Sequence, residues 1–281
     1  MDTTRAHLQV APPVTQAKPG AFSQARGALV VMGPSLVLLL GLAASLVATF
    51  LLVGVPSMAA ANGPLRALAA GGVTLLGVLL IARSGYLRWG ASDRELDCTL
   101  PGDALLPRPI AETTRAITIA ASARDIWPWL AQMGRGRGGL YSYDWLENLA
   151  GLGIHSVDRI VPALQTLAVG DPVPLGPGPN NGFLAAQVEP DRALVLRLCD
   201  PQTGGFVDHA QPRYMDVVWA FVLQPIDEGT TRLIVRFLVG GRPRRPLAMA
   251  YGLLIELPHF VMERKMMLGI RRRAERARRA A

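Results

Sequence analysis

Residues 214–239 read YMDVVWAFVLQPIDEGTTRLIVRFLV, and this stretch decides the fold more than any other in the chain. Large apolar residues recur at every second position on either side of a central Asp-Glu-Gly, residues 227–229. Such alternation is typical of strands with one buried face, and the polar cluster is typical of a tight turn. We therefore predict two antiparallel strands, 214–224 and 230–239. Their buried faces would hold Met215, Val217, Trp219, Phe221 and Leu223, and then Leu233, Val235, Phe237 and Val239.

Weaker strand signals occur on the N-terminal side of this pair. Residues 114–120 alternate, with Arg115, Ile117 and Ile119 on one face. Two further runs, 184–189 and 193–199, flank a Pro-Asp-Arg turn, and a proline-broken run at 169–175 suits a sheet edge. Together these segments predict a single antiparallel sheet.

Three helices are predicted around the sheet, over residues 123–133, 143–150 and 246–279. Ser122 caps the first helix, Asp125 is its capping-box partner, and Pro128 should kink it. Pro258 should kink or restart the last helix. A strand, helices, antiparallel strands and a long final helix form an α+β order, in which that helix covers the open face of a curved sheet.

A glycine-rich run, QMGRGRGGLYSYDWLENL, occupies residues 132–149. Its glycines formally fit the dinucleotide motif GxGxxG, but a predicted helix precedes them where that motif needs a strand, which argues against a nucleotide site. Two interpretations stay open. The run is a loop that needs unusual backbone angles, or it is a lid whose Arg135 and Arg137 meet an anionic head group.

Three aromatic residues of this run, Tyr141, Tyr143 and Trp145, either line a ligand's path or wedge the short helix against the sheet. Asp144 and Glu147 lie on one side of that helix. Such a pair of acids is common on protein surfaces and is a weak sign of catalysis.

Glu256, His259 and Glu263 are spaced to share one side of the last helix. The Glu-x-x-His spacing also occurs in di-iron bundles, but the chain has no second copy, so we predict no metal and no cofactor. A buried His259 would pair with an acid and could act as a general base. His155 is a second candidate base, and His209 is expected to be exposed.

The N-terminal third predicts a membrane anchor. Residues 1–26 read as a disordered cytoplasmic tail. The apolar runs at 27–55 and 67–82 are separated by a short loop, and we predict a two-helix transmembrane hairpin over 27–89. A cleaved secretory signal is the alternative, but the first run is too long for one. The distribution of Lys and Arg places both termini, and all that follows residue 90, on the cytoplasmic side of the cell membrane.

The formal net charge is +8, and residues 264–281 carry much of the excess. With a membrane segment in the same chain, anionic lipid is the expected partner of Arg271, Arg272 and Arg273, and the scarcity of aromatic residues there argues against nucleic acid. Residues 90–113 read as a linker and 276–281 as a basic tail. Cys98 and Cys199 have no metal-binding spacing.

Four segments together resemble the SRPBCC superfamily, the helix-grip fold of START and birch-pollen-allergen-like domains and of polyketide cyclases. They are TRAITIAAS (114–122), IWPWLAQMG (126–134), GRGGLYSYDWLENL (136–149) and PHFVMERKMMLGI (258–270). The resemblance covers about residues 110–275, with the domain itself at 114–275. It implies an apolar cavity between sheet and helix that holds a lipid-like or aromatic ligand. The expected ligand-binding residues are Trp127, Tyr141, Tyr143, Trp145, Trp219, Phe221, His259 and Met262.

Three functions follow as alternatives. The first is a membrane-tethered binding or transfer module for a hydrophobic ligand. The second is an enzyme of the cyclase or dehydratase type, in which His259 or His155 transfers a proton with an acid. The third is a membrane-anchored interaction protein whose own side chains fill the cavity. The sequence leaves the ligand, any reaction and the oligomeric state open.

Overall fold

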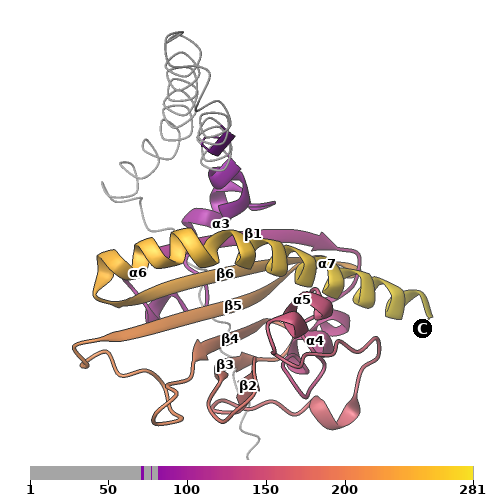
Figure 1. Ribbon diagram of the computed structural model, residues 1–281. Helices are drawn as coiled ribbons and strands as arrows, with labels where there is room; N and C mark the ends of the chain where they lie inside the picture. Colours follow the sequence, from indigo (N-terminus) through magenta and orange to yellow (C-terminus); the bar gives the residue numbers. More distant parts are fainter. Residues whose placement is uncertain (1–70, 73–76, 78–81, 281) are drawn as a thin grey trace, which may run out of the picture. The chain divides into compact units, whose positions relative to one another are not determined.

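A six-stranded antiparallel sheet, in the order β1-β6-β5-β4-β3-β2, forms the centre of the domain (Figure 1). The computed structural model describes residues 71–72, 77 and 82–280. The strands are β1 (Ala111–Ile119), β2 (Pro172–Pro174), β3 (Gly182–Glu189), β4 (Ala193–Leu198), β5 (Tyr214–Asp227) and β6 (Thr230–Arg242). The helical elements are residues 82–87, α3 (Asp93–Asp97), η2 (Asp103–Leu105), α4 (Ala123–Ala131), α5 (Asp144–Leu149), η3 (Pro162–Leu164), α6 (Arg244–Ala250), the π-helical η4 (Tyr251–Ile255) and α7 (Glu256–Ala280).

The hairpin of β5 and β6 has the register that the alternation predicts. Trp219 lies opposite Phe237, and Phe221 lies opposite Val235, so the large apolar side chains meet on one face. Cross-strand pairs of this kind stabilise a sheet and fix its register. β1 pairs with β6, which joins the first strand of the domain to its last.

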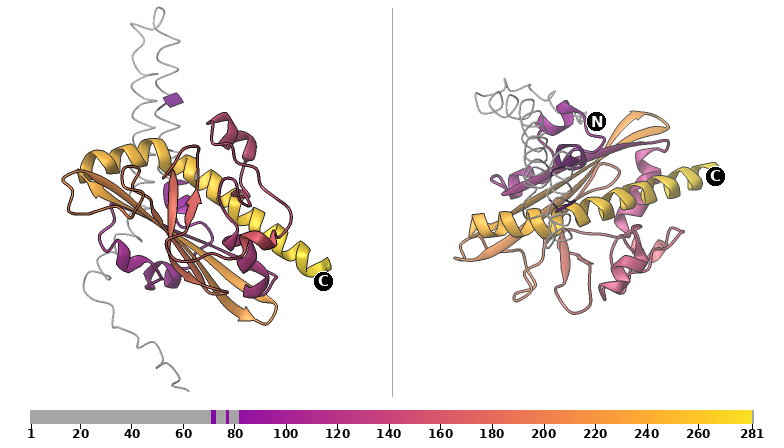
Figure 2. Two further views of the ribbon diagram at one scale, coloured as in Figure 1. Left: turned by 90° about the horizontal axis from the view of Figure 1, so that it is seen from below. Right: turned by 45° about the horizontal axis from the view of Figure 1, so that its top comes forward.

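The inner face of the sheet carries α4 and α7, and α7 runs obliquely across the strands (Figures 1 and 2). The core includes Trp129 and Leu130 of α4, and Met267 and Ile270 of α7. The capping box of Ser122 and Asp125 is present as predicted. An antiparallel sheet with a long C-terminal helix across it is the helix-grip arrangement, so the predicted α+β fold class is confirmed.

The outer face of the sheet is covered by residues 91–110, which the sequence assigned to a linker. Leu100 and Leu106 pack on this face in two small clusters. Arg236 of β6 donates hydrogen bonds to the carbonyl oxygens of Glu95, Leu96 and Cys98, and it pairs with Asp103 at 2.6 Å. The segment is thus part of the folded domain.

The last helix continues from α6 through η4 into α7, and its irregularity precedes Pro258. Proline has no N–H group for the carbonyl oxygen four residues earlier, which belongs to Leu254. The π-helical turn at residues 251–255 falls where that hydrogen bond is missing. Because of this turn, the side of the helix that faces the sheet differs between α6 and α7.

The tail at 1–26 lies outside the described residues, as does most of the predicted hairpin at 27–89. Residues 82–89 are described. They contact α7 through Arg83 and Tyr86, which both donate to the carboxylate of Glu256. None of the helices within residues 71–72, 77 and 82–280 is long and apolar enough to cross a membrane.

Candidate functional site

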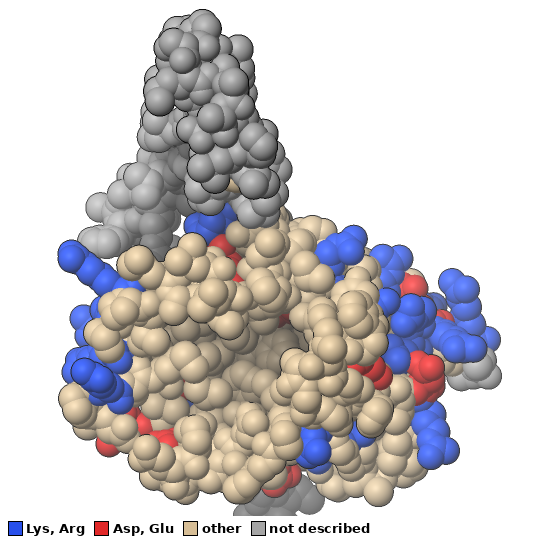
Figure 3. All heavy atoms as spheres, in the orientation of Figure 1, with Lys and Arg blue, Asp and Glu red and all other residues tan. Residues whose placement is uncertain are grey.

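On the inner face of β5 and β6, side chains are fully buried at one end of the strands and slightly exposed at the other. Phe221 and Leu233 are fully buried, whereas Trp219 and Phe237 keep exposed fractions of 6% and 8%. The space-filling view shows a hollow on this side of the domain, below α7, whose walls are uncharged (Figure 3). An apolar hollow with a few polar groups at its edge is the usual form of a small-molecule site.

A buried ion pair joins β1 to α7 at the less covered end. The side chains of Arg115 and Glu263 are both completely buried, and Nη1 of Arg115 donates to Oε2 of Glu263. Trp219 donates its indole N–H to Oε1 of Glu263 at 2.8 Å. A buried carboxylate needs such partners to stay charged. Glu263 therefore holds β1, β5 and α7 together.

His259 lies one helical turn before Glu263, and its ring faces the sheet. The ring centroid is 4.0 Å from that of Phe237 and 6.1 Å from that of Trp219. Its Nε2 is 3.6 Å from Oε1 of Glu263, beyond normal hydrogen-bond distance. Both ring nitrogens are buried and have no hydrogen-bond partner among the described atoms. Burial lowers the pKa of His259 to about 4, so the neutral ring keeps one donor and one acceptor.

Tyr251 of η4 adds a third polar atom to this end of the sheet. Its ring stacks on Phe237 with centroids 6.5 Å apart, and its buried hydroxyl has no partner among the described atoms. Burial raises the pKa of Tyr251 above its usual value, so the hydroxyl keeps its proton. Buried polar groups are nearly always hydrogen-bonded. The two ring nitrogens of His259 and the hydroxyl of Tyr251, all beside the ring of Phe237, are exceptions to this rule. We call Tyr251, Phe237, Trp219, His259 and Glu263 the polar–aromatic cluster.

Glu147 of α5 is a second buried acid on the same side of the sheet. It is 3% exposed, its Oε2 has no partner among the described atoms, and burial, with the nearby Asp144, raises its pKa to about 7. Asp144 has a different role, because it accepts two hydrogen bonds from Ser156. Glu147 would therefore change charge near neutral pH.

The predicted ligand-binding residues fall into two groups. Trp219 and His259 belong to the polar–aromatic cluster, and Trp127 lies in the adjoining core. Tyr143 and Met262 lie where the loop before α5 contacts α7, since Ser142 donates to the Met262 carbonyl oxygen and Lys265 covers the Tyr143 ring.

Three other predicted ligand residues have different positions. Tyr141 is buried, donates to the Trp129 carbonyl oxygen at 3.0 Å and packs so closely on Gly269 that any side chain there would collide with it. Phe221 is fully buried in the core, and Trp145 is 68% exposed. Tyr141 and Phe221 support the fold, and Trp145 does not line an enclosed cavity.

The arginines of the glycine run brace their own loop. Arg135 donates to the Leu152 carbonyl oxygen at 2.7 Å. Arg137 donates to the carbonyl oxygens of Ala131 and Met133. With these bonds in place, the predicted head-group contact has no support from the geometry.

Arg273 also departs from its predicted contact with lipid. It is 8% exposed, lies over the ring of Tyr141 and pairs with Asp158 at 2.7 Å. Its position on α7 turns it toward the loop after α5. By contrast, Arg271 and Arg272 are exposed.

The other histidines differ from expectation as well. His155, the second candidate base, is exposed, and its ring has no partner among the described residues. His209 is only partly exposed and binds the buried Asp216 at 2.6 Å, beside Arg197. This second cluster lies on the outer face and its acid is fully paired, so we assign it a structural role.

Sequence reasoning missed Arg115 and Tyr251 as members of the site. A signal for Arg115 was present, because an arginine in phase with Ile117 and Ile119 must be buried and must therefore find an acid. Tyr251 could not be found, because its direction depends on the π-helical turn. No group of three or more His, Cys, Asp or Glu side chains within the described ranges could hold a metal.

Comparisons with known proteins give only distant likenesses. No family model matches the chain, and no curated protein does. Solved structures with a similar course include a point mutant of norcoclaurine synthase from Thalictrum flavum, in complex with a transition-state analogue, at 15% identity and a TM-score of 0.33; the likeness covers 60% of this chain and 96% of that one. Protein NE0264 from Nitrosomonas europaea is similar at 14% identity and a TM-score of 0.35, over 60% of this chain and 97% of that one. Protein MLL2253 from Mesorhizobium loti is similar at 16% identity and a TM-score of 0.33, over 59% of this chain and 98% of that one.

Proposed function

We propose that the domain binds a small molecule with a mostly apolar body and one or two hydrogen-bonding groups. The observation that carries this proposal is His259, whose ring is packed against Phe237 and near Trp219 while both of its nitrogens lack a protein partner. Leaving a buried polar group unpaired costs about 1–3 kcal/mol. A ligand that supplies the missing hydrogen bond recovers this free energy on binding.

The charges around the cluster define the ligand's polar group. Arg115 already balances Glu263, and the lowered pKa of His259 keeps its ring neutral. An ionised ligand would bring an uncompensated charge into this region, at a high cost. A neutral hydroxyl, phenol or carbonyl group fits instead, and the rings of Trp219 and Phe237 suit a flat or chain-like apolar body.

An enzyme is the second candidate function. His259 is a neutral base beside a carboxylate that Arg115 and Trp219 fix in place, which is a suitable arrangement for accepting a proton from a bound substrate. The nearby carboxylate of Glu263 would stabilise the ring once it is charged. An activity that His259→Gln abolishes while the ligand still binds would favour this candidate over simple binding.

We also propose that residues 27–89 anchor the domain in the cell membrane with both termini cytoplasmic. The support is in the sequence, where two apolar runs are flanked by arginines and joined by a loop with a single arginine. A binding domain tethered in this way could take its ligand from the bilayer. Resistance of the full chain to alkaline extraction from membranes tests the anchor.

Native mass spectrometry of the detergent-purified full chain tests the binding proposal. The wild type, His259→Leu and His209→Gln would be compared, and the bound molecules extracted and identified. His209 is the matched control, because it also lies beside a buried acid but on the outer face of the sheet.

We expect one adduct of constant mass on the wild type and on His209→Gln, and its loss from His259→Leu. An adduct that survives His259→Leu at full occupancy would contradict the assignment of the site. A chain that carries no adduct and binds nothing from a panel of isoprenoids, fatty alcohols and polyketide-like phenols would contradict the binding function itself.

A further inference from the structure

The outer surface of η4 and the adjoining turns of α6 and α7 carries several large exposed apolar side chains, which is unusual for a helix that faces solvent. Its exposed side chains are Met249 (65%), Leu253 (76%), Leu254 (69%), Ile255 (50%), Leu257 (37%) and Val261 (41%). We call these six residues the apolar patch. Isolated exposed apolar residues are common, but a contiguous group on one element marks an interaction surface. His259 and Glu263 contact the sheet, whereas the side chains of the patch are exposed, so the patch is separate from the polar–aromatic cluster.

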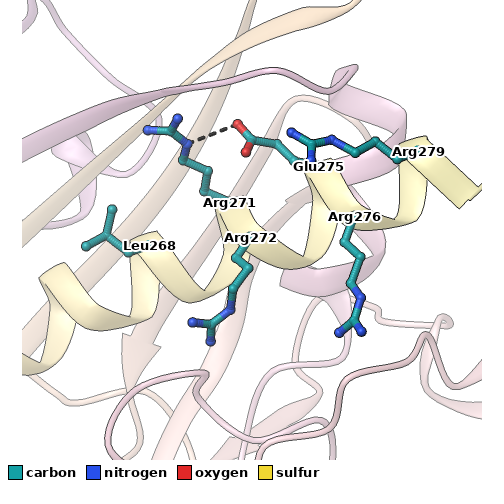
Figure 4. A pocket seen from close by; sticks show the side chains of 6 residues that line it. All are labelled: Leu268, Arg271, Arg272, Glu275, Arg276 and Arg279. Carbon is teal, nitrogen blue, oxygen red and sulfur yellow. Dashed lines mark hydrogen bonds and ion pairs between the residues drawn. The ribbon is translucent and has the colours of Figure 1, made fainter.

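The second half of α7 presents arginines on its outer surface. Leu268, Arg271, Arg272, Glu275, Arg276 and Arg279 line a shallow groove of about 490 Å³ (Figure 4). We call it the arginine groove. Glu275 neutralises Arg271 at 3.0 Å. Arg272, Arg276 and Arg279 have no acidic partner among the described residues, so the groove has an excess of positive charge. Figure 3 shows basic side chains gathered toward the C-terminal end of the domain.

Residues 83–86, at the start of the described domain, indicate which surface covers the patch. The apolar run at 67–82 ends where the described domain begins. Arg83 and Tyr86, directly after it, bind Glu256, and Tyr86 stacks on Phe260. Glu256 and Phe260 lie within the stretch that carries the apolar patch. The chain that enters the domain at Arg83 thus follows, in sequence, a run of bilayer-crossing composition, and Arg83 itself binds the stretch of α7 that carries the patch.

We propose that the outer face of α6 and α7 docks on the surface of an anionic lipid bilayer. The apolar patch enters the boundary between head groups and acyl chains, as interfacial helices do. The arginine groove contacts the anionic head groups, whose negative surface potential attracts clustered basic residues. In this orientation the proposed ligand site lies behind the docked helix, close to the lipid. This proposal depends on the proposed membrane anchor in one respect. The anchor is the reason to expect that a lipid bilayer covers the apolar patch.

Quenching by brominated lipid tests the docking in the full chain. Leu253→Cys would be labelled with an environment-sensitive fluorophore in a background with Cys98→Ser and Cys199→Ser, and reconstituted into vesicles containing brominated phosphatidylcholine and phosphatidylglycerol. Leu149→Cys on α5 is the matched control, because Leu149 is 78% exposed and lies outside the patch. We expect loss of fluorescence at residue 253 and little at residue 149.

The role of the arginine groove is tested in the same assay by adding Arg272→Gln, Arg276→Gln and Arg279→Gln. Quenching at residue 253 should fall in vesicles with phosphatidylglycerol and stay unchanged in vesicles of phosphatidylcholine alone. Equal quenching at residues 253 and 149 would overturn the proposal. So would blue-shifted emission at 253 without quenching, since that result means that protein, either residues 27–81 or a second copy, covers the patch. Alkaline extraction of the same samples reports the anchor separately, and ligand adducts report the binding site.

Discussion

The two halves of α7 bury opposite kinds of side chain. We divide α7 after Lys265 and call the two parts its first and second half. Toward the sheet, the first half presents Glu256, His259 and Glu263, whereas the second half presents Met266, Met267, Ile270 and Ala274. The outer surface shows the reverse order, with apolar residues first and arginines later. The second half has the ordinary pattern of a helix that stabilises a core. The first half has polar side chains toward the sheet and apolar side chains toward solvent, which is the reverse of this pattern. Such departures are expected where function competes with stability.

The largest effect on the free energy of unfolding should come from substitution of the buried carboxylate of Glu263, in the first half of α7. Glu263→Gln leaves the guanidinium of Arg115 buried without a counter-charge. We expect the free energy of unfolding to fall by about 3–5 kcal/mol, measured by denaturant unfolding of the full chain in detergent.

A double variant distinguishes the ion pair from simple packing. Arg115→Met together with Glu263→Gln removes the unpaired charge, and it should recover most of the stability that the single variant loses. A cost below about 1 kcal/mol for Glu263→Gln would mean that the pair is solvated, which is the range of exposed pairs.

The next largest effect is the pH dependence due to His259. Its pKa is about 4 in the folded chain, below the ordinary value of 6.5, so the unfolded chain binds a proton between these values that the folded chain does not. The stability from this histidine is complete above pH 6.5 and is lost as the pH falls toward 4. At about 1.4 kcal/mol per pKa unit, the loss is at most about 3.5 kcal/mol.

The difference between the unfolding curves of the wild type and His259→Leu measures this effect at each pH. Subtraction removes the contribution of Glu147, whose raised pKa acts in the opposite direction and costs stability as the pH rises from 4.5 to about 7. The same two curves would stay parallel if His259 were solvated, and they would diverge in the opposite direction if the fold kept it protonated.

A smaller effect is expected from the apolar half of α7. Ile270 is fully buried, and Ile270→Val should cost about 0.5–1.5 kcal/mol with no change in ligand occupancy. Native mass spectrometry and denaturant unfolding on the same sample check both statements. Loss of the adduct in this variant would mean that the ligand extends under the second half of the helix.

The smallest effect is expected at the surface of that half. Arg271 and Glu275 form an exposed pair four residues apart, and Glu275→Gln should change the free energy of unfolding by no more than about 0.5 kcal/mol. Glu275 also accepts a hydrogen bond from the Ala120 backbone N–H, which a glutamine oxygen can still accept. A cost above 1 kcal/mol would show that this contact with β1 depends on charge.

The strands and their buried faces could be predicted from the sequence because a period of two leaves little choice of face. Trp219 and Phe237 meet across β5 and β6 as the alternation requires. The capping box at Ser122 was equally local. His259 and Glu263 could be placed on one side of a helix, since three and four residues make about one turn.

The remaining errors came from contacts that no local pattern contains. Glu256 shares the predicted helix side with His259, yet Arg83 and Tyr86 bind it from a segment far away in sequence. Arg273 follows two exposed arginines, but the helix rotation turns it toward Tyr141. His209 pairs with Asp216 only because a loop returns over the outer face.

Nuclear magnetic resonance of the four histidine side chains tests the central claim most directly. The full chain would be labelled with ¹⁵N in its histidines and observed as purified and after removal of bound lipid by detergent exchange, with His209→Gln and His259→Leu assigning the signals. We expect the ring nitrogens of His259 to change shift when the ligand is removed, while those of His209 stay constant. Identical His259 signals in the two samples would contradict the claim that its free hydrogen-bonding groups serve a ligand.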